Sequence, residues 1–177
     1  MRNVILEQLE KVTELLQYFT GSTVITQADR TYTAATIGAG LTVGDTVVIA
    51  GAANSASNGT FVLSSVASGA VIVAGPAIGA NETATITVNQ EWPGTFKEVQ
   101  GFAKLVGSIN TSGAAIIYID QSGDGVNIDY TSSWAVTAAT ALAFEADVVL
   151  PWAKIRVRTN AADQTTMRAY LYGRKIS

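Results

Sequence analysis

Apolar and polar residues alternate in short runs along most of this 177-residue chain, and a turn signal closes each run. The clearest case is GSINTSGAAIIYIDQSGDGVNID at 107–129, where an apolar run stops at Ser-Gly-Asp-Gly and resumes at Val126. Glycine and aspartate at such a break are typical of a tight turn between strands. This stretch therefore predicts a β-hairpin.

A second stretch, VVLPWAKIRVRTNAADQTTMRAYLYGRK at 148–175, has the two-residue period of half-buried strands in two successive runs. We expect these runs to pair as antiparallel strands across the loop 159–165. Their polar positions would then share one basic and aromatic face, made of Lys154, Arg156, Arg158, Arg168, Tyr170 and Tyr172. Such a face suits docking on an acidic protein neighbour, which we favour. A solvated face, or stacking on a glycan or nucleic acid, is the alternative.

These two stretches resemble a β-sandwich module that recurs in structural proteins of tailed bacteriophages, on decorated capsids and on neck, tail or baseplate parts. The resemblance covers roughly the last 75 to 80 residues, the length of a small sandwich. Upstream, LTVGDTVVIAGAANSASNGTFVLSSVASGAVIVAG followed by NETATITV resembles a small β-barrel module of phage virion proteins. Neither resemblance carries a catalytic signature.

Composition supports a packed core, since 48% of the residues are hydrophobic and only 14% are charged. The net charge of −3 argues against a protein that binds nucleic acid through its whole surface. The sequence contains no run of 18 apolar residues, so we expect no membrane span. The first residues also lack the apolar core of a signal peptide, so we expect synthesis in a bacterial cytoplasm.

Cysteine and histidine are both absent from the sequence. The chain therefore has no disulfides, no thiolate or imidazole catalysis and no zinc site of the usual kind. We expect no cofactor, no metal and no enzymatic activity.

The N-terminal residues predict an amphipathic helix over 3–20, within a first segment at 1–21. Its apolar stripe has the 4-3-4-3 spacing of a heptad seam: Ile5, Leu9, Val12, Leu16 and Phe19. A helix of this length needs a surface to pack on. Packing on its own domain and packing between subunits both remain open.

The next segment, 22–92, predicts a small β-barrel of six short strands, at 23–26, 31–37, 46–50, 59–64, 70–74 and 84–88. Phe61 is the large aromatic expected to fill its centre. Only four charged residues lie between positions 22 and 90, and a surface this poor in charge suits a packed neighbour.

The last segment, 93–177, begins beyond the Glu-Trp-Pro-Gly joint at 91–94 and predicts an antiparallel β-sandwich. Its expected strands are 99–106, 114–119, 126–129, 134–136, 142–149, 153–158 and 166–173. The fold class is thus mainly β, with an N-terminal helix, a barrel and a sandwich.

Two acidic features resemble chemical sites. The turn from Asp120 to Asp129 begins like a calcium loop but has Thr131 where the closing glutamate belongs, so a plain hairpin turn is favoured. Glu145 and Asp147 share one strand face, which suits an exposed sheet surface better than a catalytic pair.

The function predicted from the sequence is a structural protein of a tailed phage virion, most simply a capsid decoration, or cement, protein. A homotrimer that packs on the major capsid protein or another virion protein fits this prediction, with no nucleic-acid or membrane partner. The alternatives are a neck, tail or baseplate component, and a carbohydrate-binding module for host recognition.

Overall fold

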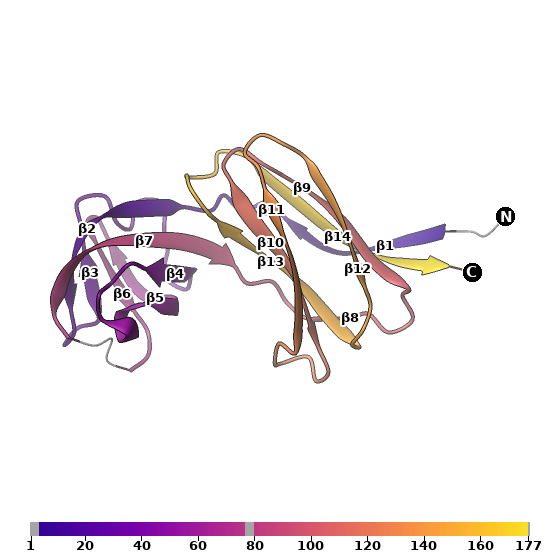
Figure 1. The fold of residues 1–177 in the computed structure, drawn as a ribbon, viewed down its shortest axis with the longest axis horizontal. Helices are drawn as coiled ribbons and strands as arrows, with labels where there is room; N and C mark the ends of the chain where they lie inside the picture. The colour runs from indigo at the N-terminus through magenta and orange to yellow at the C-terminus, as the bar shows by residue number, and fades with distance from the viewer. Residues whose placement is uncertain (1–3, 77–79, 177) are drawn as a thin grey trace. The chain divides into compact units, whose positions relative to one another are not determined.

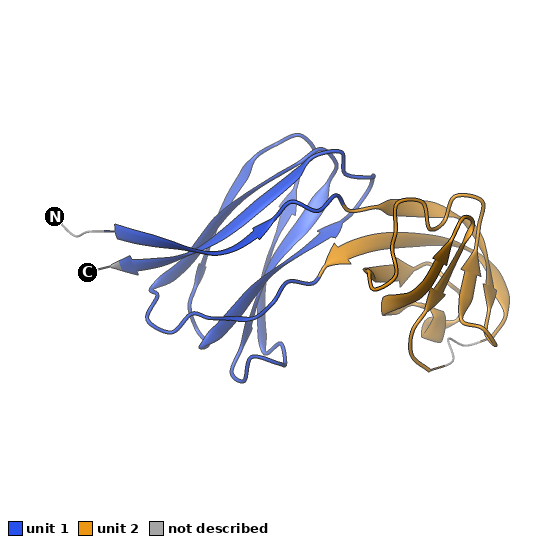
Figure 2. Cartoon of the chain, turned by 180° about the vertical axis from the view of Figure 1, so that it is seen from behind, with its two compact units in different colours: residues 1–15, 93–177 blue, residues 16–92 orange. Residues whose placement is uncertain are grey.

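The computed structural model describes residues 4–76 and 80–176, which form two compact β units. Residues 16–92 make one unit, and residues 1–15 join 93–177 in the other (Figure 2). The smaller unit is therefore inserted into the chain of the larger one, between its first strand and the rest.

The inserted unit is a closed six-stranded barrel. Its strands are β2 (Tyr18–Thr26), β3 (Thr31–Thr33), β4 (Thr46–Ala50), β5 (Gly59–Ala67), β6 (Ala70–Val73) and β7 (Glu82–Trp92). They pair antiparallel in the order β7-β2-β3-β6-β5-β4, and β4 pairs back to β7 (Figure 1). A short 3-10 helix, η1 (Ser55–Ser57), links β4 to β5. The predicted small barrel and its six strands are confirmed.

The barrel core consists of alternating inward residues such as Ile25, Val47 and Ile86. The fully buried aromatic at its centre is Tyr32, whose hydroxyl donates to the Ser57 carbonyl at 2.8 Å. Phe61 only packs against this cluster while partly exposed, so the expectation that it fills the centre is wrong. Tyr32 can be buried because its hydroxyl has a partner.

The larger unit is a β-sandwich. Its first sheet has the order β1-β14-β9-β12, made of β1 (Val4–Val12), β14 (Met167–Ile176), β9 (Lys104–Thr111) and β12 (Leu142–Asp147). The second sheet contains β11 (Tyr130–Val136), β10 (Ala115–Ser122) and β13 (Trp152–Thr159), with the short β8 (Lys97–Glu98) beside β13. Trp134 of β11 meets Phe144 of β12 across the interior, with ring centroids 5.3 Å apart.

The predicted N-terminal helix is wrong. Residues 4–12 form β1, which pairs antiparallel with β14, and residues 18–26 belong to the barrel strand β2; Asn3, the first residue of the expected helix, lies outside the described part. A β-bulge between Gln8 and Glu10 shifts the side-chain alternation of β1 by one residue. The bulge removes the plain two-residue period, so the apolar spacing imitates a heptad.

The expected heptad positions accordingly lie on different elements. Ile5 is 53% exposed on the free edge strand β1, while Leu9 is half-buried at the bulge and Val12 is buried at the end of β1. Leu16 is buried at the start of the barrel unit, and Phe19 packs against the barrel core from β2. These five residues form no common stripe.

Candidate docking surfaces

The cationic side chains of β13 lie on the outer face of the second sheet. Ala153, Ile155 and Val157 point into the sandwich and are fully buried, so the alternating Lys154, Arg156 and Arg158 point outward. We call the outer surface of β10 and β13, formed by Ile116, Tyr118, Lys154, Arg156 and Arg158, the cationic face.

Arg156 braces this face through a paired ion contact with Asp120 of β10. Its Nε lies 2.7 Å from Asp120 Oδ2 and its second guanidinium nitrogen 3.1 Å from Oδ1, while Thr131 donates to Oδ1 at 2.8 Å. Asp120 is fully buried under these partners. The bidentate pair therefore ties three strands together, and Arg156 is chiefly a structural residue.

Tyr118 supplies the aromatic part of the cationic face. The guanidinium carbon of Arg156 lies 4.1 Å from its ring centroid and that of Arg158 lies 5.5 Å away. Lys154 Nζ lies 4.8 Å from the ring centroid of Phe96. Among the described residues, no direct ion pair joins Lys154 or Arg158 to an acid, although the charge of Lys154 acts on Glu10. The outward position of both cations suits contact with a partner's carboxylates.

The predicted pairing of the two basic strands is wrong, because β13 belongs to the second sheet and β14 to the first. The loop between β13 and β14 therefore connects the second sheet to the first. Buried Gln164 accepts from the Gly113 backbone N–H at 3.0 Å and donates to the Ala114 carbonyl. It therefore anchors the loop to the residues that directly precede β10. Arg168, Tyr170 and Tyr172 thus lie on a different face from Lys154, Arg156 and Arg158.

The outer face of β14 carries a pair of tyrosines. Tyr170 and Tyr172 stack with ring centroids 6.3 Å apart, and Lys11 Nζ lies 5.9 Å from the Tyr170 centroid. Arg168 is exposed beside them, opposite Asn110 of β9. This tyrosine pair is a separate aromatic surface on the first sheet.

Glu145 and Asp147 lie on the outer face of β12, as the alternation predicts, and cations neutralise both. Lys104 Nζ is 3.2 Å from Glu145 and 2.6 Å from Asp147, and Arg174 is 3.1 Å from Glu145. The two carboxylates raise the pKa of Lys104, through its hydrogen bonds to Asp147 first and Glu145 second. The geometry is that of a surface ion network across neighbouring strands.

The turn between β10 and β11 uses its acids to bind its own backbone. Asp124 accepts from the N–H groups of Asn127 and Val126 at 2.8 Å each, and from the Ser122 hydroxyl. These donors, Asn127 and Val126 above all, hold the pKa of Asp124 far below its usual range. The carboxylate therefore caps the turn, which explains the calcium-like sequence without an ion. Within the described residues, no three His, Cys, Asp or Glu side chains are placed to share a metal.

Glu10 is a functional element of the fold that the sequence did not reveal. From the edge strand β1, its carboxylate accepts from the Ile155 N–H of the second sheet at 3.2 Å and from the Thr95 N–H at 3.1 Å. Burial raises its pKa, against the opposing effect of these N–H groups, Lys97 and Lys154. The sequence signal for Glu10 would have been an acidic residue at an inward-facing position of a strand. The bulge in β1 shifts the alternation, so the sequence does not show that Glu10 faces inward.

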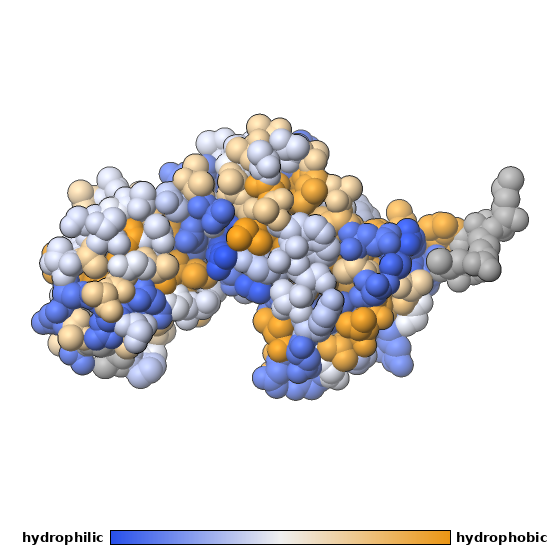
Figure 3. All heavy atoms as spheres, in the orientation of Figure 1, coloured by the Kyte–Doolittle hydropathy of each residue, from blue (hydrophilic) through white to orange (hydrophobic). Residues whose placement is uncertain are grey.

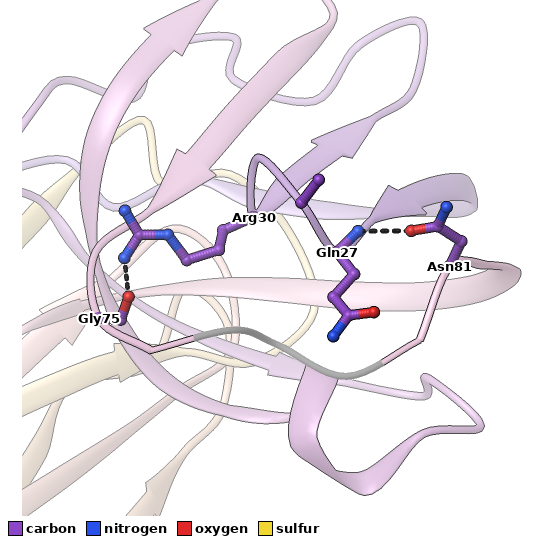
Figure 4. Close-up of a pocket in the computed structure, with 5 residues that line it drawn as sticks. Gln27, Arg30, Gly75 and Asn81 are labelled. Atoms are coloured by element: carbon purple, nitrogen blue, oxygen red, sulfur yellow. Dashed lines mark hydrogen bonds between the residues drawn. The ribbon is translucent and has the colours of Figure 1, made fainter.

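A shallow polar hollow of the barrel is lined by Gln27, Ala28, Arg30, Gly75 and Asn81 (Figure 4). Arg30 points to the Gly75 carbonyl and donates to it, while the Gln27 N–H donates to Asn81 at 2.7 Å. The polar groups tie the β2–β3 turn to neighbouring segments. The polar groups that line the hollow therefore have a structural role in holding this turn.

No known family model matches the chain, and no curated protein matches it either. In the described part, no helix has the length and apolar character that a membrane crossing needs.

Proposed function

We propose that this protein is a non-enzymatic structural component of a tailed phage virion, and specifically a capsid decoration protein that stabilises the head by surface packing. The sequence resemblance of its barrel and sandwich segments to virion modules motivates the proposal. The observation that carries it is the neutral exterior of the barrel.

Three of the few charged side chains of the barrel bond to backbone groups of the barrel itself. Asp45 accepts from the Thr42 N–H at 2.7 Å, Glu82 accepts from the Ala53 N–H at 2.8 Å, and Arg30 donates to Gly75. The rest of the described surface is rich in Thr, Ser and Ala and exposes Val24, Val43 and Val62 by 46–65%. A neutral surface with exposed valines suits packing against a protein neighbour better than free diffusion.

In this proposal, the chain is synthesised in the host bacterial cytoplasm and assembles onto the virion. Its partners are the major capsid protein, or another virion protein, and sister copies in a homotrimer. Interfaces of about 1,600 Å², repeated by symmetry, would suffice without covalent links. The cationic face is the surface assigned to an acidic neighbour.

The experiment is a binding assay of the purified chain on emptied capsid shells and on isolated tails. A decoration protein binds shells and leaves tails bare. Binding to tails or necks alone would reject the decoration role and support a neck, tail or baseplate component. Binding to neither would reject a virion role.

One observation favours a second function, carbohydrate binding at a host-recognition site. The tyrosine pair on β14 has polar neighbours, including Asn110 and Arg168, and aromatic rings are the usual sugar-stacking groups. Trp134 cannot contribute, because it packs inside the sandwich on Phe144. A glycan array distinguishes the two functions: a hit that Tyr170→Ala abolishes supports the carbohydrate module.

A further inference from the structure

One end of the sandwich exposes several large apolar side chains on two adjacent loops. Val126 is 77% exposed, Ile128 47%, Tyr130 48% and Val149 55%. Figure 3 shows apolar residues gathered at the lower end of this unit, where the β10–β11 and β12–β13 loops lie in Figure 1. We call these four residues and their two loops the apolar tip.

The apolar tip is preorganised, since the end of β10 holds both of its loops: the Asp129 N–H of the β10–β11 loop donates to the Gln121 carbonyl at 3.0 Å. The side chain of Gln121 donates to the Asp147 carbonyl at 2.7 Å and accepts from the Val149 and Leu150 N–H groups. Gly125, with φ of +74°, leaves room for the Trp152 ring, which a Cβ there would meet at 3.1 Å. A preorganised loop loses little entropy on binding, so exposed apolar side chains on it mark an interaction surface.

Charge limits what can cover the apolar tip. Asp124 and Asp129 lie in the β10–β11 loop and Glu98 pairs opposite Trp152, with Lys97 the neighbouring cation. This acidic rim opposes nucleic acid and anionic lipid. It also opposes a twofold contact of the tip with itself, because like charges would then face each other. The partner must offer apolar surface bordered by cations.

The cationic face of the same chain has this chemistry. It combines Ile116 and Tyr118 with Lys154 and Arg158, which have no ion pair among the described residues. We propose that the apolar tip of one copy docks on the cationic face of the next copy. The contact is heterologous, so repeating it around a closed symmetry axis gives a ring, and the homotrimer of the proposed function is such a ring. This inference rests on the proposed function, because it names the acidic neighbour of the cationic face.

The test uses sedimentation velocity of the full chain. Wild type should form a closed oligomer, and Val126→Ser or Ile128→Ser should each weaken association by about tenfold or more, as anchor residues do. Leu6→Ser, at a 56% exposed leucine of the edge strand β1, is the matched control and should leave association unchanged. Lys154→Glu with Arg158→Glu should abolish association, whereas Arg168→Glu on the other sheet should not.

Charge reversal gives the decisive result. Glu98→Lys with Val126→Lys reverses the tip while keeping every printed loop bond, and this variant alone should be monomeric. Mixing it with the Lys154→Glu, Arg158→Glu variant should restore association between unlike copies, because only then does each tip meet a face of opposite charge. A ring of three cannot alternate the two variants, so the mixture should give heterodimers or even-numbered assemblies. A monomeric wild type, or a mixture that stays monomeric, overturns the inference.

Shell binding is scored separately. A monomer that still binds emptied shells overturns the contact between copies and leaves the decoration role intact. A tip-dependent oligomer that binds no virion part leaves the contact intact and rejects the virion role.

Discussion

Removing the Glu10 carboxylate should destabilise the sandwich unit without affecting the barrel. Glu10 is the acceptor for two backbone N–H groups, those of Ile155 and Thr95. A buried donor left without a partner costs about 1–3 kcal/mol. Ile155 is fully buried whereas Thr95 is exposed and can bond to water, so Glu10→Ala should cost about 2–4 kcal/mol, side-chain packing included.

Calorimetry is the appropriate assay. For a unit of this size, residues 1–15 and 93–177, that loss corresponds to a melting temperature lower by roughly 10–25 °C. Hydrogen exchange at the Ile155 amide should accelerate as well. Glu7→Gln is the matched control, because Glu7 lies on the same strand and its side chain is in an exposed pair with Lys175, worth about 0–1 kcal/mol. Equal melting of the two variants would refute the assigned role of Glu10.

The pH dependence of this residue has a defined sign. Burial raises the folded-state pKa of Glu10 above its ordinary value of 4.5. The pH-dependent part of its contribution to stability is therefore complete below the unfolded-state pKa and is lost as the pH rises through the folded-state pKa. The stability difference between wild type and Glu10→Gln, measured by urea unfolding, should shrink from acid to neutral pH. A difference that grows with pH would contradict the burial argument.

Two further predictions concern buried polar groups. Asp120→Asn should destabilise the sandwich by about 3–5 kcal/mol, because it removes the buried carboxylate of the bidentate pair with Arg156, and urea unfolding measures the loss. Tyr32→Phe should cost about 0.5–1.5 kcal/mol through the lost bond to Ser57. Burial raises the pKa of Tyr32 to about 12, so ultraviolet titration should find one phenol fewer ionising in that range in the variant, while an unchanged titration would place another tyrosine there.

The barrel was predictable because its strands are short and its turns are explicit. The strand β4 was predicted at its observed bounds, Thr46–Ala50, and β5 begins at Gly59, the first residue of the strand predicted at 59–64. Inward and outward residues alternate regularly there, so local sequence and final burial agree. The centre was harder to predict, since hydrophobicity alone favoured Phe61 over Tyr32.

The sandwich was predicted as a class, but its pairing was not. A local reading joined residues 153–158 to 166–173 as a hairpin, yet these strands lie in different sheets. The sequence of the loop between them is typical of a polar hairpin turn. The burial of Gln164 and Thr159, which the sequence does not show, is what distinguishes it as a connection between the two sheets. Partner choice in a sandwich depends on long-range contacts, which local periodicity does not encode.

The strand β1 was not predicted because its partner is also distant in the sequence. The insertion of the barrel creates this distance. The first strand of the sandwich finds its partner β14 more than 150 residues later, because the whole barrel lies between them in sequence. An insertion of this kind requires that each unit hold its two chain crossings together. In the barrel, Gln17 and Gln90 exchange bonds of 2.8 and 2.9 Å, and in the sandwich, Glu10 accepts from Thr95 at 3.1 Å. Each unit thus joins its entering and leaving segments by a glutamine or glutamate side chain. Such contacts are specified by tertiary structure, so a linear reading assigned the N-terminal residues to a separate helix.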